Sequence, residues 1–369
     1  MAKKAYIGVD GVARKIRRAY LGVDGVARRI KKAYIGVGGV ARPCWTGGEL
    51  EYYGTITPLS YTRGAMASAN NGAYALFAGG HNNSATRFAY VEAYDKSLAR
   101  TSASSLSAAR SDHAGTHTKD YAIFSGGNGG LANVDAYDKT LTRTTAPSPN
   151  LGRYRVAATH IGNYGLIAGG WTSDNSPSNV VDAYDNSLAR TNPTTLSLAR
   201  QQMGAATVGG YAIFAGGRTT NASSSKEDRV DAYNASLART TATPLQYKAT
   251  ICASASVGDY ALFLSNERGT SFVFVYDKDL SATILTPLVT QITDATATSI
   301  GDFALFTGGY NGSTYNAETF VFNKDLSQTF TTPLSVARRY LKGENIGDYG
   351  LFAGGFTNEL LATVDAYMV

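Results

Sequence analysis

The feature that most constrains this chain is a repeat of about 46 residues that fills the sequence from about residue 49 to its end. Each unit has an aromatic residue followed five positions later by a small residue, usually the first of a Gly-Gly pair. A polar loop and a strand-like segment such as VDAY follow. Four short strands in a unit of this length indicate a propeller blade rather than a helical repeat. The seven pairs are Tyr74/Gly79, Tyr121/Gly126, Tyr164/Gly169, Tyr211/Gly216, Tyr260/Ser265, Phe303/Gly308 and Tyr349/Gly354.

The two ends of the repeat region complete each other. A fourth-strand leucine such as Leu59 lies 20 residues before the small pair in six of the seven units. Leu59 has no third strand before it, while the sequence stops at Val369, directly after the third strand of the last unit. We therefore expect residues 51–59 to complete the seventh blade beside residues 364–369, which would close the ring and remove both open edges.

These motifs resemble those of Kelch-type β-propellers, whose blades carry a Gly-Gly pair at the end of the second strand and a Tyr in the third. The resemblance covers about residues 49–369 and implies an all-β fold of seven blades. Thr replaces the fourth-strand Trp of the family, as in ARTTATPL, and Ser265-Asn266 replaces the glycine pair of the fifth unit. The sequence therefore predicts a seven-bladed Kelch-like β-propeller over residues 51–369, with a departure in blade five.

Residues 1–43 contain a different, 14-residue repeat with three copies, which begin at Ala5, Ala19 and Ala33. Each copy places Asp-Gly or Gly-Gly between two β-prone segments, the strongest local signal for a tight hairpin. We expect an N-terminal β-hairpin extension, joined to the propeller by a linker over residues 44–50. Such hairpins bury little apolar surface alone, so we expect them to become ordered in a homo-oligomer or against a larger assembly.

The positive charge of the chain is concentrated in this N-terminal segment. Residues 1–43 hold 11 Lys or Arg and 2 Asp, whereas the remainder holds 23 basic and 26 acidic residues. Such asymmetry is typical of a segment that meets nucleic acid, an anionic envelope or an acidic assembly partner. The alternative is that the basic residues only protect exposed strands from edge pairing.

Length variation within the long repeat is confined to the loop after each small pair. These loops open on one face of a propeller, so this face is the expected ligand-binding surface. Aromatic or charged residues directly after the pair suit a sugar ring and its hydroxyl groups. The alternative is that they only cover strand ends. The candidates are His81, Trp171, Arg218, Tyr310 and Phe356.

An arginine also recurs 16 residues before the small pair, at the start of the innermost strand. Its resemblance to a Kelch position implies a place near the channel mouth on the same face. Converging guanidinium groups would favour a carboxylate or phosphate. The alternative, also consistent with the family pattern, is that each arginine bonds neighbouring backbone carbonyls. These candidate ligand-binding residues are Arg63, Arg110, Arg153, Arg200 and Arg338.

No catalytic, metal or cofactor site is predicted. His113 and His117 lie at or near an inner strand, where a metal site is not favoured, and nucleophile, phosphate-loop and dinucleotide motifs are not visible. Apolar runs are too short to span a bilayer, and we expect no secretory signal. Carboxylates that recur at the turn between the third and fourth strands suit local backbone bonding. They are Asp95, Asp138, Asp185 and Asp277.

The 14-residue repeats resemble short repeats in structural proteins of bacteriophages and prophages. This resemblance implies a virion protein made in the host cytoplasm, with residues 1–43 docked on capsid or tail proteins. The propeller would then bind a host-surface or environmental glycan without turnover. The first alternative is a Kelch-type carbohydrate-active enzyme such as a sialic acid epimerase or sugar oxidase. The second is a protein-interaction scaffold, and binding of nucleic acid by the basic segment is also left open.

Overall fold

The computed structural model describes residues 6–9, 12–15, 19–23, 26–30, 32–37, 40–46, 49–82, 86–267, 269–288 and 291–369. The chain divides into two compact units, Met1–Glu51 with Met368–Val369, and Tyr52–Tyr367. The first unit contains three two-stranded antiparallel sheets. They are β1 (Tyr6–Val9) with β2 (Val12–Lys15), β3 (Ala19–Val23) with β4 (Val26–Ile30), and β5 (Lys32–Val37) with β6 (Val40–Thr46).

The second unit is built from seven four-stranded antiparallel sheets, which we number as blades one to seven along the chain. Blade one consists of β8 (Ala67–Asn70), β9 (Tyr74–Ala78), β10 (Val91–Asp95) and β11 (Arg100–Ala103). Blade two consists of β12 (Ala114–His117), β13 (Ala122–Ser125), β14 (Val134–Tyr137) and β15 (Arg143–Thr145). Blade three consists of β16 (Ala157–Ile161), β17 (Tyr164–Ala168), β18 (Val181–Tyr184) and β19 (Arg190–Thr191).

Blades four to seven follow the same order from the innermost strand outward. Blade four consists of β20 (Gly204–Val208), β21 (Tyr211–Ala215), β22 (Val230–Asn234) and β23 (Arg239–Thr241), and blade five of β24 (Ile251–Val257), β25 (Tyr260–Glu267), β26 (Thr270–Asp277) and β27 (Ala282–Leu288). Blade six consists of β28 (Thr296–Ile300), β29 (Phe303–Thr307), β30 (Thr319–Asn323) and β31 (Gln328–Thr331). Blade seven consists of β32 (Lys342–Ile346), β33 (Tyr349–Ala353), β34 (Val364–Met368) and β7 (Glu51–Ile56). One short 3-10 helix, Ser223–Ser225, lies in a loop of blade four.

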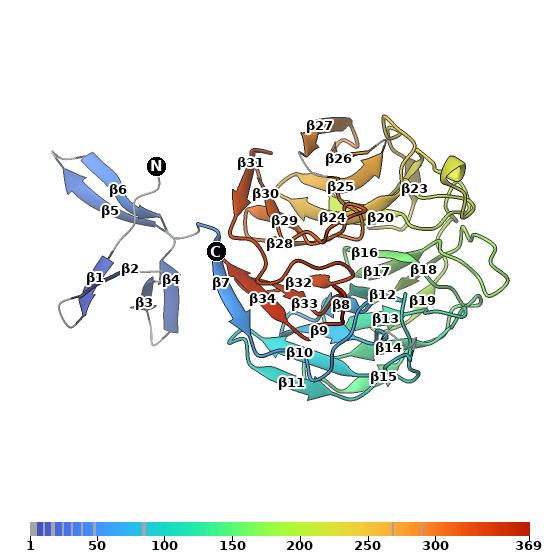
Figure 1. The fold of residues 1–369 in the computed structure, drawn as a ribbon, viewed down its shortest axis with the longest axis horizontal. Coiled ribbons are helices and arrows are strands. Elements are labelled where there is room, and N and C mark those ends of the chain that lie inside the picture. The colour runs from blue at the N-terminus through green and yellow to red at the C-terminus, as the bar shows by residue number, and fades with distance from the viewer. Residues whose placement is uncertain are drawn as a thin grey trace. The chain divides into compact units, whose positions relative to one another are not determined.

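The first strands of the blades lie at the centre of the propeller and follow one another in a ring (Figure 1). Each innermost strand contacts those of the two adjacent blades, and β8 of blade one contacts both β12 and β32. Buried apolar side chains of adjacent blades pack together in clusters, such as those between blades four and five and between blades five and six. The predicted all-β, seven-bladed propeller is therefore confirmed.

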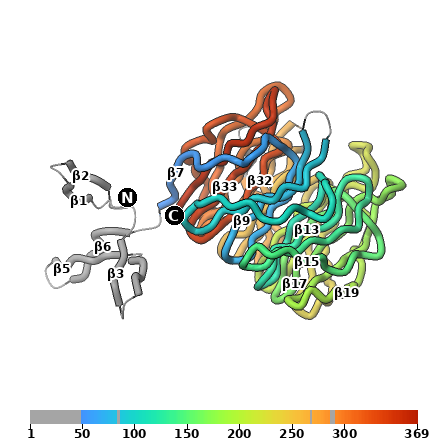
Figure 2. Tube along the Cα trace, turned by 90° about the horizontal axis from the view of Figure 1, so that it is seen from below, coloured from blue at the N-terminus to red at the C-terminus, as the bar shows by residue number. Residues whose placement is uncertain are grey.

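Blade seven joins strands from both ends of the propeller. β7 is the outermost strand of this sheet and pairs with β34, so blue and red segments lie side by side in Figure 1 and Figure 2. The Tyr52 hydroxyl on β7 donates a 2.5 Å hydrogen bond to Asp365 on β34, and the rings of Tyr52 and Tyr367 lie 5.1 Å apart. With this strand in place, blade seven has four strands like the other six.

The two middle strands of each blade carry the core because both of their faces are covered. In blade one, Phe77 and Tyr94 are fully buried and their rings meet edge to face. The Tyr94 hydroxyl also donates a 2.8 Å hydrogen bond to the Thr57 carbonyl, in the connection from blade seven. The third-strand Tyr therefore contributes apolar burial, about 1.5–3 kcal/mol for a large side chain, and anchors the incoming connection.

The Gly-Gly pair is required by the approach of the next connection. Gly79 and Gly80 have φ values of 64° and 100°, which disfavour other residues. A Cβ atom on Gly79 would lie 2.4 Å from the Arg110 carbonyl oxygen, the same oxygen that accepts a 2.9 Å hydrogen bond from Gly80 N–H. A larger residue would separate blade one from the connection that leads into blade two.

The recurring turn carboxylates have the predicted local role. Asp95 accepts hydrogen bonds from the backbone N–H groups of Ser97 and Ala99, at 2.7 and 3.0 Å. The Ser97 hydroxyl, which donates to the same carboxylate at 2.6 Å, lowers the pKa of Asp95 most, and the backbone bonds lower it further. Leu98, which completes the turn, has a φ of 66°. The same two backbone bonds are made by Asp138, Asp185 and Asp277.

Blade five departs from the others where the glycine pair is missing. Strand β25 continues through Ser265 to Glu267, where it pairs with Thr270 at the start of β26. The register shifts between Ile251 and Ala253 and again between Ser271 and Val273. Without glycine the chain has no left-handed break at this point, so the strand pair extends beyond the length seen in the other blades.

Candidate binding site at the channel mouth

The five recurring arginines are buried, and each is paired with a carboxylate of its own blade. They are at most 2% exposed, and Arg110 and Arg200 lie 2.8 Å from Asp135 and Asp231 on the adjacent third strand. Each is also bonded to a backbone carbonyl of its blade, as Arg110 is to Phe124 at 3.2 Å. The remaining pairs are Arg63 with Glu92, Arg153 with Asp182, and Arg338 with Asp365.

The carboxylate of each pair also secures the connection between blades. Asp135 accepts hydrogen bonds from the backbone N–H and the hydroxyl of Ser107, and it lies 3.1 Å from Arg143 on the outermost strand. An added anion would have to compete with this carboxylate for Arg110 in a region closed to solvent. The geometry therefore favours the structural alternative for these arginines, and we do not include them in the binding site.

The candidates directly after the small pairs occupy equivalent places at one end of the propeller. Each forms an isolated β-bridge with the residue that follows the recurring arginine position. Trp171 is only 4% exposed, so its ring covers strand ends, whereas the other four retain exposed surface. The bridges are Gly64 with His81, Tyr154 with Trp171, Gln201 with Arg218, Thr293 with Tyr310, and Arg339 with Phe356.

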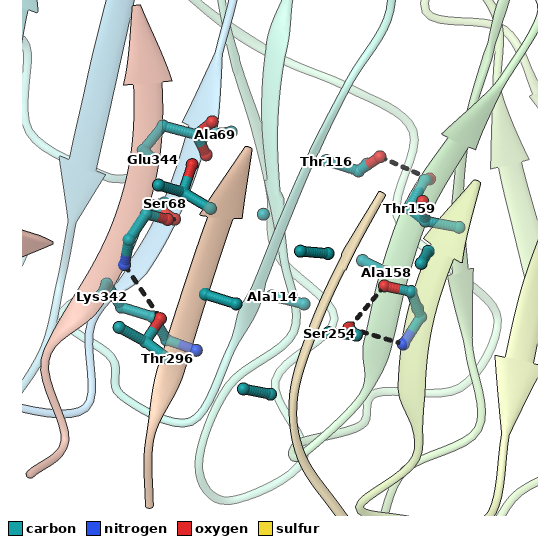
Figure 3. A pocket seen from close by; sticks show the side chains of 18 of the residues that line it. Ser68, Ala69, Ala114, Thr116, Ala158, Thr159, Ser254, Thr296, Lys342 and Glu344 are labelled. Atoms are coloured by element: carbon teal, nitrogen blue, oxygen red, sulfur yellow. Dashed lines mark hydrogen bonds between the residues drawn. The ribbon is translucent and has the colours of Figure 1, made fainter. Parts of the chain in front are cut away.

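The central channel has a volume of about 550 Å³ and is lined by the seven innermost strands. Small polar side chains join these strands across the blades: Thr116 donates to the Thr159 carbonyl at 2.6 Å, and Ser254 to the Ala205 carbonyl at 2.7 Å. Figure 3 shows this lining, with Lys342 and Glu344 on one wall. The channel opens, at the end where the candidates lie, into a second hollow of about 520 Å³.

Six non-glycine residues with a left-handed backbone surround this hollow, the mouth of the channel. Their φ values lie between 51° and 57°, a conformation that side chains other than glycine rarely adopt. The conformation directs backbone groups toward adjacent blades: Arg155 N–H donates to the Asp112 carbonyl at 2.8 Å, and Ala65 N–H to the Tyr340 carbonyl at 3.2 Å. The six are Ala65, Asp112, Arg155, Gln202, Asp294 and Tyr340, which we call the mouth ring.

The mouth ring combines a constant backbone with varied side chains. Hydrogen bonds between blades explain the shared conformation, but glycine or asparagine would adopt it with less strain. Instead, the six positions carry two carboxylates, a guanidinium, an amide, a phenol and a methyl group. Structural repetition does not require this variety, whereas recognition of an asymmetric ligand does.

Charge is unevenly distributed around the mouth. Arg155 and Arg218 make no ion pair with any residue that the structure describes, and burial, together with the nearby Arg155, lowers the pKa of Arg218. On the other side, Asp294 lies 3.5 Å from Arg339. Burial raises the pKa of Asp294, and Arg339 opposes this shift. The mouth therefore offers an uncompensated cationic side and a partly neutralised acidic side.

A neighbouring hollow of about 530 Å³ extends the mouth outward over blades seven, one and two, because Asp112 and Tyr340 line both spaces. His81, Phe356 and Asn128 also line this outer hollow. The Arg339 guanidinium lies 4.7 Å from the ring centre of Tyr340, 4.8 Å from that of Tyr310 and 5.6 Å from that of Phe356. Arg339 thus fixes a group of aromatic rings beside the two hollows.

No helix among the residues that the structure describes has the length and apolar character needed to cross a membrane. Within the same residues, no three His, Cys, Asp or Glu side chains are grouped to hold a metal ion.

Three of the mouth-ring residues that matter most, Asp112, Arg155 and Tyr340, are not among the sequence-based candidates. Each stands two positions after a recurring arginine, in a column of the repeat where the residue type changes from blade to blade. The preceding column of the repeat varies as much, with Gly64, Tyr154 and Arg339 among its members, so variation alone does not single out the mouth-ring positions in the sequence.

No protein-family model matches the chain, and no curated protein matches it. Among solved structures, 717 chains match, which shows how common the fold is. One, described as "Structure of YjhT", is 14% identical to this chain, with a TM-score of 0.55. The match covers 72% of this chain and 96% of that one. At this identity the likeness supports the propeller fold alone.

Proposed function

We propose that this protein is a non-enzymatic binding protein whose propeller holds a glycan at the channel mouth. The observation that carries the proposal is the mouth ring, which has one backbone conformation and chemically different side chains around a shared hollow. A solvent-filled hollow lined mainly for structural reasons would be expected to repeat its side chains as it repeats its backbone.

The chemistry of the two hollows suits a sugar. Tyr340 is 40% exposed, so a ring face is available for stacking against the apolar face of a pyranose. Gln202 in the mouth and Asn128 in the outer hollow can donate to and accept from sugar hydroxyl groups. Each hollow falls within the range of about 300–1,000 Å³ typical of small-molecule sites. The cationic side formed by Arg155 and Arg218 favours a glycan that carries an acidic group.

The context of this binding comes from the N-terminal repeats. Residues 1–43 resemble repeats of bacteriophage structural proteins and carry a net positive charge, with 11 Lys or Arg and 2 Asp, whereas acidic residues outnumber basic ones in the remainder. We extend the proposal to attachment of the protein, through these residues, to the capsid or tail of a virion. Co-purification of the full chain with phage particles, lost on deletion of residues 1–43, is the expected result. Retention of the truncated chain on particles would contradict it.

Binding to a glycan array tests the function of the propeller. We expect the full chain to select a small set of acidic glycans, and the double variant Arg155→Ala/Arg218→Ala to bind them at least about tenfold more weakly. Arg229→Ala is a matched control, because this arginine is 53% exposed and lies outside both hollows. Equal binding by the double variant and the control would place the ligand elsewhere.

A further inference from the structure

Three ionisable side chains interrupt the repeat pattern at the inner end of the mouth. Lys342 and Glu344 lie on the innermost strand of blade seven, where the corresponding residues of other blades are small or hydroxyl-bearing. In blade one these positions are Ala67 and Ala69. The residues equivalent to Lys342 in blades two, three, four and six are Ala114, Ala157, Gly204 and Thr296.

His113 is the third departure. Blades one, three and four place Met66, Val156 and Met203 at this position. His113 is nearly fully buried, and neither ring nitrogen has a hydrogen-bond partner. Burial lowers its pKa well below the ordinary value, and the nearby positive charges of Arg110 and Lys342 add to the shift. A buried imidazole without partners is unusual, which indicates that these nitrogens serve something other than the fold.

The Lys342 amine is accessible from the ligand side. Lys342 lines both the channel and the mouth hollow, and its amine forms no hydrogen bond or ion pair with any described residue. Glu344 is held in place by Asn70, whose amide lies 3.2 Å from one carboxylate oxygen. Blade one, between Lys342 and His113, contributes Met66 and the small side chains of Ala65 and Ala67 here, and the two alanines leave room for a ligand group.

We propose that Lys342 is a reactive amine that reversibly captures a carbonyl compound, such as an aldehyde or the open-chain form of a reducing sugar, as an imine. This activity goes beyond glycan binding at the mouth ring and does not depend on it. Capture without turnover would hold the carbonyl end of a ligand at the base of the mouth.

The surroundings of Lys342 suit this chemistry. Burial lowers the pKa of its amine, although the carboxylates of Asp112 and Glu344 oppose the shift, so the neutral, nucleophilic form is favoured relative to a solvated lysine. Burial also raises the pKa of Glu344, which favours its protonated form. An acid and an amine two residues apart on one strand project from the same side of it.

The capture step requires no oxidant or reductant. The Lys342 nitrogen forms a bond to the carbonyl carbon, and one proton moves from this nitrogen to the carbonyl oxygen to give a carbinolamine. Glu344 then donates a proton to the hydroxyl group, the C–O bond breaks and water leaves. A C=N bond forms, and the nitrogen returns its remaining proton to the Glu344 carboxylate. Water adds back to release the same carbonyl compound.

Reductive trapping tests the proposal on the full chain. The protein is incubated at neutral pH with glyoxylate and sodium cyanoborohydride, and the adduct is located by peptide mass spectrometry. We expect Lys342 to be modified at least about tenfold faster than Lys324, since burial favours the neutral amine of Lys342, whereas Lys324 is exposed and its charged form is paired with Asp302 at 3.1 Å. Equal labelling of both lysines, or an unmodified Lys342, would overturn the proposal.

Variants separate reactivity from folding. Lys342→Arg keeps the positive charge but should abolish the fast adduct, Glu344→Gln should slow it at least about tenfold, and Lys324→Arg should leave it unchanged. Thermal unfolding of each variant shows whether the propeller persists. Because the labelling site is mapped in the unaltered protein, the result stands even if a variant unfolds. Glyoxylate has no sugar ring, so the two proposals are tested separately. Glycan binding can fail while glyoxylate is trapped, and trapping can fail while a glycan binds.

Discussion

Blades one to four and seven hold their inter-blade connections with a buried ion pair, whereas blades five and six use apolar packing at the same places. Arg200 and Asp231 represent the first arrangement in blade four. In blade six the equivalent residues are Ile292 and Phe320, both almost fully buried in one hydrophobic cluster. Blade five places Ala249 and Phe274 there. One fold therefore contains two solutions to the same packing problem.

The positions change together. Where the buried arginine and carboxylate are absent, the outer arginine is absent too: Arg239 of blade four corresponds to Gln328 of blade six. A buried charge without its partner is strongly unfavourable, while an apolar pair of similar volume is tolerated. In blade seven the outer arginine is replaced by Tyr52, whose hydroxyl donates to Asp365. The comparison teaches that the buried arginine and its carboxylate are kept or replaced together, whereas their outer partner differs between blades.

Removal of one member of the ionic unit should have the largest effect. Arg200→Leu leaves the Asp231 carboxylate buried without its closest cation, so we expect the free energy of unfolding to fall by about 3–5 kcal/mol. Urea unfolding measures the loss, with Arg229→Leu as an exposed control that should change stability by less than about 0.5 kcal/mol. A loss below about 1 kcal/mol for Arg200→Leu would show that the ionic arrangement is not a unit.

Replacement of the whole unit should recover much of that loss. The triple variant Arg200→Ile/Asp231→Phe/Arg239→Gln copies blade six into blade four and removes every unpaired charge. We expect it to be at least about 2 kcal/mol more stable than Arg200→Leu in the same urea titration. If the triple variant is instead the less stable of the two, the apolar arrangement depends on features peculiar to blades five and six.

The fold could be predicted because its signals are local and repeated. Tyr94 and the pair Gly79-Gly80 mark strands and breaks whose spacing alone specifies a blade. The role of Arg110 could not be predicted in the same way, because the sequence does not distinguish an arginine at the channel mouth from an arginine paired with Asp135. The sequence does contain the answer: the arginine is missing in the two blades where Phe274 and Phe320 replace the acid.

Burial and backbone strain explain the remaining differences. Trp171 has the composition of a sugar-stacking residue, but only three-dimensional packing reveals that its ring is covered. Asp112 and Arg155 are placed at the mouth by a left-handed backbone, which no local sequence motif predicts. The strain of this conformation is offset by hydrogen bonds to other blades, which are distant in the sequence. A site assembled from single residues of six repeats leaves little trace in any one repeat.

A smaller effect concerns the inner strands, where blades two and three place His117 and His160 and blade four places Thr207. The two rings lie 4.0 Å apart, and burial, with a smaller effect of His160, lowers the pKa of His117 to about 3. In the unfolded chain a histidine titrates near pH 6.5. The unfolded state therefore binds more protons between these values, and stability falls as the pH falls below about 6.5.

The variant His117→Thr isolates this contribution. Relative to it, we expect the unaltered protein to lose about 1 kcal/mol more stability between pH 7 and pH 5.5, measured by urea unfolding at each pH. Parallel pH profiles for the two proteins would indicate that His117 is protonated as readily in the folded state as in the unfolded one.

Arg153 and Arg155, two residues apart in blade three, provide the most direct test of where the ligand binds. Arg153 is paired with Asp182 inside the blade, whereas Arg155 lines the mouth without an ion pair. Affinity for a glycan selected on the array, measured together with unfolding free energy, should separate them. We predict that Arg155→Ala loses about tenfold or more in affinity at unchanged stability, while Arg153→Ala loses stability and its folded fraction binds normally. The opposite assignment, with affinity lost only in folded Arg153→Ala, would contradict binding at the mouth ring.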